Sequence, residues 1–219
     1  MSADTEIVIE SFPRSASSFA VAAFRIAQEP DPTSIAHHTH MPAQVLRAAR
    51  RRIPALVLIR NVEDAVISIL IWDPRLSVSS AIRGYIHFYE PLVPHRSGFV
   101  LGTFDEVVND FGSLVLRVNE RFATDFRPFQ HTPQHLVRIR EEIETDFRSR
   151  AGDTEALERT IPRPSALREG LKVELRARYR MEAAEPLRRR AEEIFQRLVP
   201  SSRDRSPESD LHRAHGARR

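Results

Sequence analysis

Residues Ala55–Ile59 (ALVLI) form a run of five apolar side chains that is followed at once by Arg60. A strand without polar alternation is typical of a parallel sheet whose two faces are both covered by helices. Further segments rich in strand-forming residues occur at 6–12 and 99–104, with helical periodicity between them. This alternation predicts βαβ units with right-handed crossovers. We therefore expect a three-layer α/β fold around a central, mostly parallel sheet.

Apolar residues at three- and four-residue spacing predict the helices, and the second half of the chain is expected to be helix-rich. The expected helices span 18–28, 42–52, 61–72, 77–92, 114–122, 134–150, 166–180 and 182–198. Ser17 or Ser18 is expected to cap the first of them. The domain is expected to cover residues 1–199. Residues 200–219 contain almost no apolar side chains, so we interpret them as a disordered basic tail.

Composition excludes several classes of protein. The 219 residues include no cysteine, which rules out disulfides, thiolate metal sites and cysteine nucleophiles. Lys172 is the only lysine, and the formal net charge is only +3, so the basic residues do not by themselves indicate a nucleic-acid partner. From these residues we expect no secretory leader and no membrane-spanning segment, and the expected location is cytoplasmic. The oligomeric state is not predicted.

The first candidate site is the segment 11–19, which joins the first strand to the first helix. Small residues there, Ser15, Ala16, Ser17 and Ser18, allow several backbone N–H groups to point inward at a helix N-terminus, where anions bind. Arg14 adds a guanidinium to the same loop. The segment is not a Walker A motif, because GxxxxGK[ST] is absent. A capped loop without a ligand is the alternative interpretation.

The second candidate site begins at Arg60, directly after the apolar strand. Ser68 follows eight residues later, about two helical turns along, on the side of the helix entrance. An arginine and a hydroxyl in this arrangement can hold one phosphate group between them. An ordinary salt bridge from Arg60 and an ordinary helical serine are the alternative.

Three histidines, His37, His38 and His40, lie between the two candidate anion sites in the sequence. A metal site is disfavoured because no cysteine and no carboxylate at ligand spacing accompanies them. A single histidine acting as a general base fits better, since its ordinary pKa suits removal of a proton from an attacking alcohol. A solvated cluster of loop histidines is the alternative.

Together these segments resemble the motifs of the PAPS-dependent sulfotransferases, where PAPS is 3′-phosphoadenosine 5′-phosphosulfate. The family's YPKSGTTW loop is similar to FPRSASSF at 12–19, and its YVxRNPKDxxVS segment is similar to LIRNVEDAVIS at 58–68. The family's KTHLP segment is similar to HTHMP at 38–42. The three motifs occur in the family's order along the chain.

The resemblance implies a P-loop-like nucleotide-binding topology and a sulfuryl transfer that leaves adenosine 3′,5′-bisphosphate. It implies that Arg14, Ser15, Ala16, Ser17 and Ser18 hold the 5′-phosphosulfate. Arg60 and Ser68 would hold the 3′-phosphate. The implied catalytic residues are His40, as general base, and Arg14, which stabilises charge at the transferring group. The acceptor would be a hydroxyl or amine of a small molecule, lipid or carbohydrate, with no metal required.

The sequence departs from the family pattern at several positions. Arg14 and His38 replace two family lysines, Ala16 replaces the loop glycine, and Phe104 replaces a tyrosine. The family's C-terminal RKGxxGxW segment is not recognisable. The segment 163–168 is the candidate substitute, because Arg163 and Arg168 flank a serine at an expected helix start.

Two other functions stay open at this stage. A P-loop kinase would share the architecture, but it would carry a Walker lysine and a magnesium-binding aspartate at a strand end. A non-catalytic relative would keep the fold and bind a partner through its helical half. The aromatic segment 85–89 either lines the acceptor pocket or packs in the core.

Overall fold

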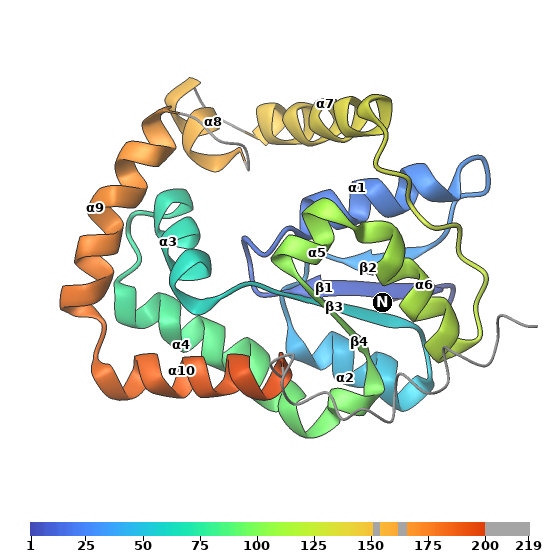
Figure 1. Cartoon of the computed structure of the whole chain (residues 1–219), viewed down its shortest axis with the longest axis horizontal. Helices are drawn as coiled ribbons and strands as arrows, with labels where there is room; N and C mark the ends of the chain where they lie inside the picture. Colours follow the sequence, from blue (N-terminus) through green and yellow to red (C-terminus); the bar gives the residue numbers. More distant parts are fainter. Residues whose placement is uncertain (151–153, 162–165, 200–219) are drawn as a thin grey trace, which may run out of the picture.

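The structure is a computed structural model that describes residues 1–150, 154–161 and 166–199 (Figure 1). Arg163 and the expected tail at 200–219 lie outside the described residues. The nucleotide-binding role of Arg163 and the disorder of the tail therefore stay predictions.

Four parallel strands form one sheet at the centre of the molecule (Figure 1). They are β1 (Ile7–Ser11), β2 (Ile35–His37), β3 (Ala55–Ile59) and β4 (Val100–Thr103), in the order β2-β1-β3-β4. The three predicted strands are confirmed. The sequence did not predict β2, because three residues are too few to show a periodicity.

Helices cover both faces of the sheet, as expected for a three-layer α/β fold. They are α1 (Ser17–Gln28), α2 (Pro42–Arg51), α3 (Val62–Trp72), α4 (Val78–Tyr89), α5 (Phe104–Asn109), α6 (Phe111–Phe122), α7 (Pro133–Arg150), α8 (Thr154–Thr160), α9 (Ala166–Glu182) and α10 (Glu185–Leu198), with a 3₁₀ segment at Glu90–Gly98. The predicted helices are confirmed within a few residues. The short helices α5 and α8 were not predicted.

Alternate residues of the central strands face two separate hydrophobic cores. Val57 and Ile59 of β3 belong to the core beneath α2, α3, α4, α9 and α10. Leu56 and Leu58 belong to the core beneath α1, α5, α6 and α7. Burial on both faces explains why β3 consists of apolar residues without alternation.

Two buried tyrosines of α4 hold the carboxyl ends of β1 and β3 together. The Tyr89 hydroxyl donates to the carbonyl of Leu58 at 2.7 Å and accepts from the N–H of Phe12 at 3.3 Å. The Tyr85 hydroxyl donates to the carbonyl of Arg60 at 2.8 Å. Both side chains are fully buried, so the segment 85–89 packs in the core and does not line an acceptor pocket. The loops that follow β1 and β3 therefore start from fixed positions.

Replacement of Tyr89 by phenylalanine tests this connection. Tyr89→Phe leaves the Leu58 carbonyl and the Phe12 N–H without their partner, and we expect a loss of about 1–3 kcal/mol in the free energy of unfolding. Urea denaturation measures the change. Tyr179→Phe is the matched control, because the buried Tyr179 hydroxyl has no hydrogen-bond partner within the described ranges. Equal losses in the two variants would contradict the role of Tyr89.

Candidate functional site

The loop between β1 and α1 is held in an unusual backbone conformation. Arg14 and Ala16 both have φ near 69°, in the left-handed region that favours glycine. Ala16 is the N-cap residue of α1 and offers no side-chain cap, so the expectation that Ser17 or Ser18 caps this helix was wrong. The first intrahelical bond is donated by Ala20 to Ala16, which leaves the N–H groups of Ser17–Phe19 without intrahelical partners. Such a helix start is suited to an anion.

This helix start opens on a cavity of about 680 Å³. Most of the predicted site residues lie in its wall: Arg14, Ala16, Ser17, Ser18, Arg60, Ser68 and Arg168. Ser15 is fully buried beneath the loop and is not part of the wall. The two candidate anion sites, far apart in the sequence, therefore meet in one cavity.

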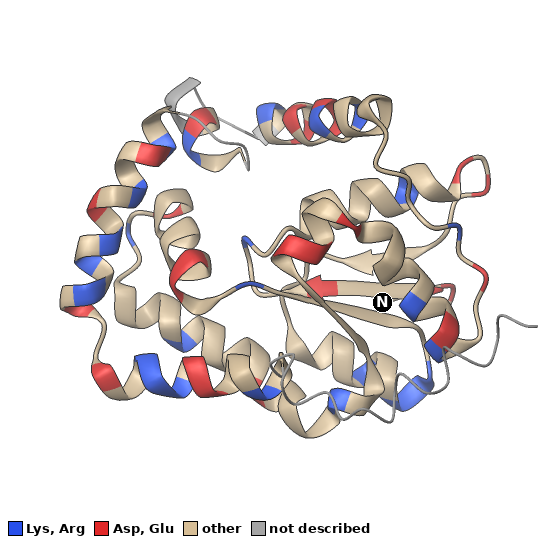
Figure 2. Cartoon of the chain, viewed as in Figure 1, with Lys and Arg blue, Asp and Glu red and all other residues tan. Residues whose placement is uncertain are grey.

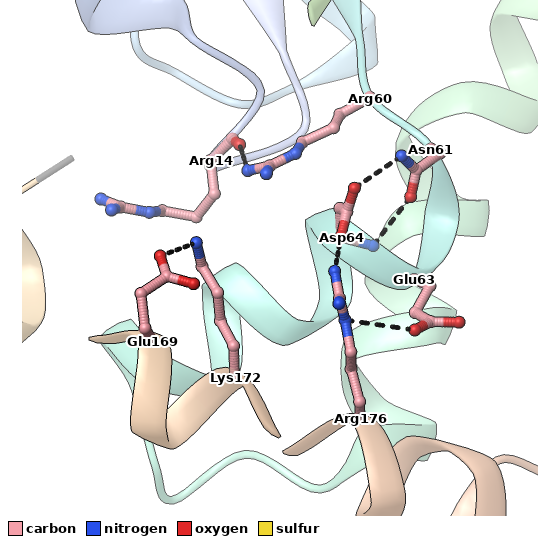
Figure 3. Close-up of polar contacts among 8 residues, drawn as sticks. All are labelled: Arg14, Arg60, Asn61, Glu63, Asp64, Glu169, Lys172 and Arg176. Atoms are coloured by element: carbon pink, nitrogen blue, oxygen red, sulfur yellow. Dashed lines mark hydrogen bonds and ion pairs between the residues drawn. The ribbon is translucent and has the colours of Figure 1, made fainter. Parts of the chain in front are cut away.

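Arg60, after β3, extends toward the backbone of Arg14, after β1, and the Arg14 side chain points away from Arg60 (Figure 3). Arg60 donates from its guanidinium to the carbonyl of Arg14 at 3.3 Å, and its guanidinium carbon lies 4.2 Å from the centre of the Phe104 ring. Arg14 donates to the Ser68 hydroxyl at 3.3 Å and to the carbonyl of Thr160 at 2.9 Å. Ser68 thus pairs with Arg14 in this structure and not with Arg60.

The charges of Arg14 and Arg60 are poorly compensated. Within the part of the chain that the structure describes, neither guanidinium forms an ion pair or hydrogen bond with a carboxylate. Burial, Arg168 and Arg60 lower the pKa of Arg14 to about 9, and burial also lowers the pKa of Arg60. Two nearby carboxylates, Asp64 and Asp105, partly oppose this and raise the pKa of Arg60.

The lowered pKa of Arg14 makes the free energy of unfolding depend on pH in a definite direction. Because the folded state binds this proton more weakly than the unfolded state, the charged guanidinium destabilises the ligand-free fold at neutral pH. The penalty is relieved only as the pH rises above about 9. An anion in the cavity would relieve it at neutral pH, since a nearby negative charge favours the charged guanidinium.

Helix α9 contributes a row of cations that the sequence analysis recognised only in part. Arg168, Lys172 and Arg176 follow one another at four-residue spacing, and all three line the cavity. Arg176 pairs with Asp64 at 3.1 Å and Glu63 at 3.6 Å, and Lys172 pairs with Glu169 at 2.6 Å (Figure 3). The four-residue spacing was visible in the sequence, but only the packing of α9 on α3 shows which face it presents.

The opposite wall of the cavity is apolar in part. Helix α7 presents Leu136, Ile139 and Ile143, again at three- and four-residue spacing, together with the charged residues Arg140 and Glu144. Phe19 of α1 and Ile161 extend this surface. The cavity therefore joins cations from the strand ends and α9 to a surface on α7 that is apolar in part.

His40 lies beside this cavity and is not part of its wall. Its ring Nδ1 is 2.8 Å from the carbonyl oxygen of Ser11. A carbonyl oxygen can only accept, so the hydrogen of the neutral ring is on Nδ1 and the Nε2 lone pair is available as a base. The ring centre of His38 lies 5.8 Å from that of His40, and His38 Nε2 contacts the Ser18 hydroxyl at 3.3 Å. His38 and Ser18 thus connect His40 to the wall of the cavity.

A chain of hydrogen bonds runs from Arg25 through His37 and His38 to Ser18. Arg25 can only donate, so His37 accepts at Nε2 and, when neutral, donates from Nδ1 to Nδ1 of His38. Burial and Arg25 lower the pKa of His37, which favours this neutral form. His38 then donates from Nε2 to Ser18, and the hydroxyl hydrogen of Ser18 is left for a ligand. Among the described residues, no three or more histidines and carboxylates form a group suited to a metal ion.

Comparison with solved structures shows a likeness of fold. The sequence matches no protein-family model and no curated protein. The structure is similar to the crystal structure of mouse sulfotransferase SULT7A1 complexed with PAP, with a TM-score of 0.50 and 10% sequence identity. The similarity covers 97% of this chain and 90% of the mouse chain. The chain has the α/β fold of a sulfotransferase. Separately, within the described ranges, no helix has the length and apolar character needed to cross a membrane.

Replacement of Ala16 by glycine tests whether the left-handed conformation of this residue is strained. A left-handed residue with a Cβ is strained by roughly 1–2 kcal/mol, which glycine avoids at the cost of greater flexibility in the unfolded chain. We expect Ala16→Gly to raise the free energy of unfolding by up to about 1 kcal/mol, measured by urea denaturation. Ala177→Gly on the exposed face of α9 is the control, and it should lower stability by about 1 kcal/mol. Destabilisation by Ala16→Gly would contradict the strained backbone.

Proposed function

We propose that this protein is a PAPS-dependent sulfotransferase. The observation that carries the proposal is the pair of arginines at neighbouring strand ends, Arg14 and Arg60, which share one cavity and lack carboxylate partners in the described ranges. A nucleotide with anionic groups on both sides of its ribose supplies the missing charge to both. The sulfotransferase fold, seen in a relative complexed with PAP, agrees with this ligand class.

The 5′-phosphosulfate is proposed to sit against the start of α1. There the N–H groups of Ser17 and Ser18 lack intrahelical partners, and the Ser18 hydroxyl can donate its hydrogen to a ligand when it accepts from His38. Arg14 borders the same region and stabilises negative charge on the sulfuryl oxygens. The Ser15 contribution is limited to its backbone, because its side chain is buried.

The 3′-phosphate is proposed to sit between β3 and α9. Arg60, Ser68 and Arg168 line the cavity, and Lys172 lines it as well. Lys172 and Arg168 thereby supply the cations that the unrecognised C-terminal family segment would otherwise provide. Arg163 keeps its predicted role as a proposal.

His40 is proposed to take the proton of the acceptor hydroxyl or amine at Nε2. The acceptor oxygen or nitrogen forms a bond to sulfur as the bond from sulfur to the bridging phosphate oxygen breaks. The bridging oxygen leaves with adenosine 3′,5′-bisphosphate, and Arg14 stabilises the charge that grows there. His40 is not part of the cavity wall, so we place the acceptor at the edge of the cavity near Ser18, whose hydroxyl contacts His38, the ring neighbour of His40.

Adenosine 3′,5′-bisphosphate binding is the direct test. At about one hundred times its dissociation constant we expect stabilisation by about 2.7 kcal/mol, or a rise in melting temperature of roughly 5–10 °C. ATP with Mg²⁺ at the same concentration should give a smaller rise. A preference for ATP with Mg²⁺ would favour a kinase, and a folded protein that binds neither would favour a non-catalytic relative.

Arg14→Met is expected to separate stability from binding. Removal of a poorly compensated buried charge should leave the ligand-free melting temperature unchanged or higher, whereas loss of charge-assisted hydrogen bonds should weaken bisphosphate binding about tenfold to a hundredfold. Calorimetric titration and thermal denaturation measure the two effects. Arg75→Met, at an arginine that is not part of the cavity wall, is the control and should leave affinity unchanged. Unchanged affinity in Arg14→Met would remove Arg14 from the site.

His40→Ala is expected to reduce turnover about a hundredfold or more, as loss of a general base does, with bisphosphate affinity nearly unchanged. Radiolabelled PAPS with a panel of alcohols, phenols and amines gives the rate. His87→Ala, at an exposed histidine on α4, is the control. Full turnover in His40→Ala would require a different base.

A further inference from the structure

Glu10 is a charged residue in the middle of a hydrophobic sheet. Figure 2 shows that the strands are almost free of charged residues. Glu10 is the single Lys, Arg, Asp or Glu residue in the four described strands, and its side chain is fully buried. Burial of an ionised carboxylate is strongly unfavourable unless hydrogen bonds replace its water. The hydrogen-bond partners of Glu10 therefore show which groups replace water around its carboxylate.

Four hydrogen bonds reach the Glu10 carboxylate, and all come from the segment 39–44. Thr39 donates from its backbone N–H at 2.9 Å and from its hydroxyl at 2.8 Å. His40 donates from its backbone N–H at 3.0 Å, and Gln44 donates from its side-chain amide at 2.9 Å. An ionised carboxylate is an acceptor only, which matches four donors.

The backbone and the ring of His40 are held by two consecutive residues of β1. Glu10 accepts from the backbone N–H, and the Ser11 carbonyl accepts from ring Nδ1. His40 has φ of 52°, a left-handed conformation that a residue other than glycine keeps only when its surroundings enforce it. The Glu10 bonds to Thr39 and His40 are such an enforcement.

We propose that Glu10 is the positioning residue for His40. By fixing the backbone of residues 39 and 40, it places the ring so that Nδ1 donates to Ser11 and Nε2 keeps its lone pair for the acceptor's proton. Glu10 does not touch the reacting atoms and acts through the backbone of His40. The functional meaning of this placement rests on the proposed function, whereas the placement itself is measurable without any substrate.

The tautomer of His40 is the decisive readout. Long-range ¹H–¹⁵N NMR at about pH 8, where an ordinary histidine is neutral, should show His40 protonated at Nδ1 in the wild-type chain. In Glu10→Gln, one carboxylate oxygen is replaced by an amide N–H₂ group, which cannot accept the hydrogen bonds that Thr39, His40 and Gln44 donate. The segment that contains His40 should then shift, and we expect the fraction of His40 protonated at Nδ1 to fall. Gln28→Ala is the control, because Gln28 is also buried and hydrogen-bonded, to Arg127, away from the histidine loop. It should destabilise the fold and leave the His40 tautomer unchanged.

A folded Glu10→Gln protein with the wild-type His40 tautomer would overturn the proposal. If Glu10→Gln does not fold, Thr39→Val and Gln44→Leu remove one bond each and leave the carboxylate in place. The double variant should then shift the tautomer population, and an unchanged spectrum would overturn the proposal equally.

Activity separates this inference from the proposed function. With an acceptor in hand, Glu10→Gln should lower kcat about tenfold to a hundredfold, as expected for misplacement of a catalytic group, with bisphosphate affinity unchanged. Gln28→Ala should keep the wild-type kcat. If the wild-type protein binds no bisphosphate, the proposed function fails while the tautomer result still stands. If it binds and transfers, but the tautomer is the same in Glu10→Gln, only the role of Glu10 fails.

Discussion

The parallel pairing of β1 with β3 is the interaction on which the site depends. Ser11 lies opposite Leu58 in this register, so the loop after β1 and the residue after β3 leave the sheet at the same edge. Tyr85 and Tyr89 of α4 fix these strand ends through three hydrogen bonds to the backbone. Arg14 and Arg60 are consequently brought together although 46 positions separate them.

This proximity carries an electrostatic cost that the ligand-free fold does not offset. Arg14 bonds to a hydroxyl and a carbonyl, Arg60 bonds to a carbonyl and covers an aromatic ring, and Arg168 lies near both. Groups of this kind are common at functional sites, where stability is given up for ligand binding. Asp64 and Glu169 form their ion pairs with Arg176 and Lys172 of α9, and neither forms an ion pair with Arg14 or Arg60.

The histidine loop shows the same dependence on β1. Glu10 and Ser11 of this strand hold the backbone and ring of His40, and the following residues begin the anion-binding loop. One strand thus sets both the base and the anion site. The two loops that follow β1 and β2 contain four residues in left-handed conformations: Arg14, Ala16, His38 and His40. Such conformations are strained in residues other than glycine.

The sequence by itself determined the α/β class and three of the four strands. It also identified residues that line the cavity, namely Arg14, Ala16–Ser18, Arg60 and Ser68. These follow from local patterns: an apolar strand that ends in a polar loop has its functional residues at that end. Only the tertiary structure decided that Ser68 pairs with Arg14, that α9 adds Lys172 and Arg176, and that Glu10 binds the loop of His40. Such contacts join residues more than 25 positions apart, and no local periodicity encodes which distant side chains the packed helices and strands will bring together.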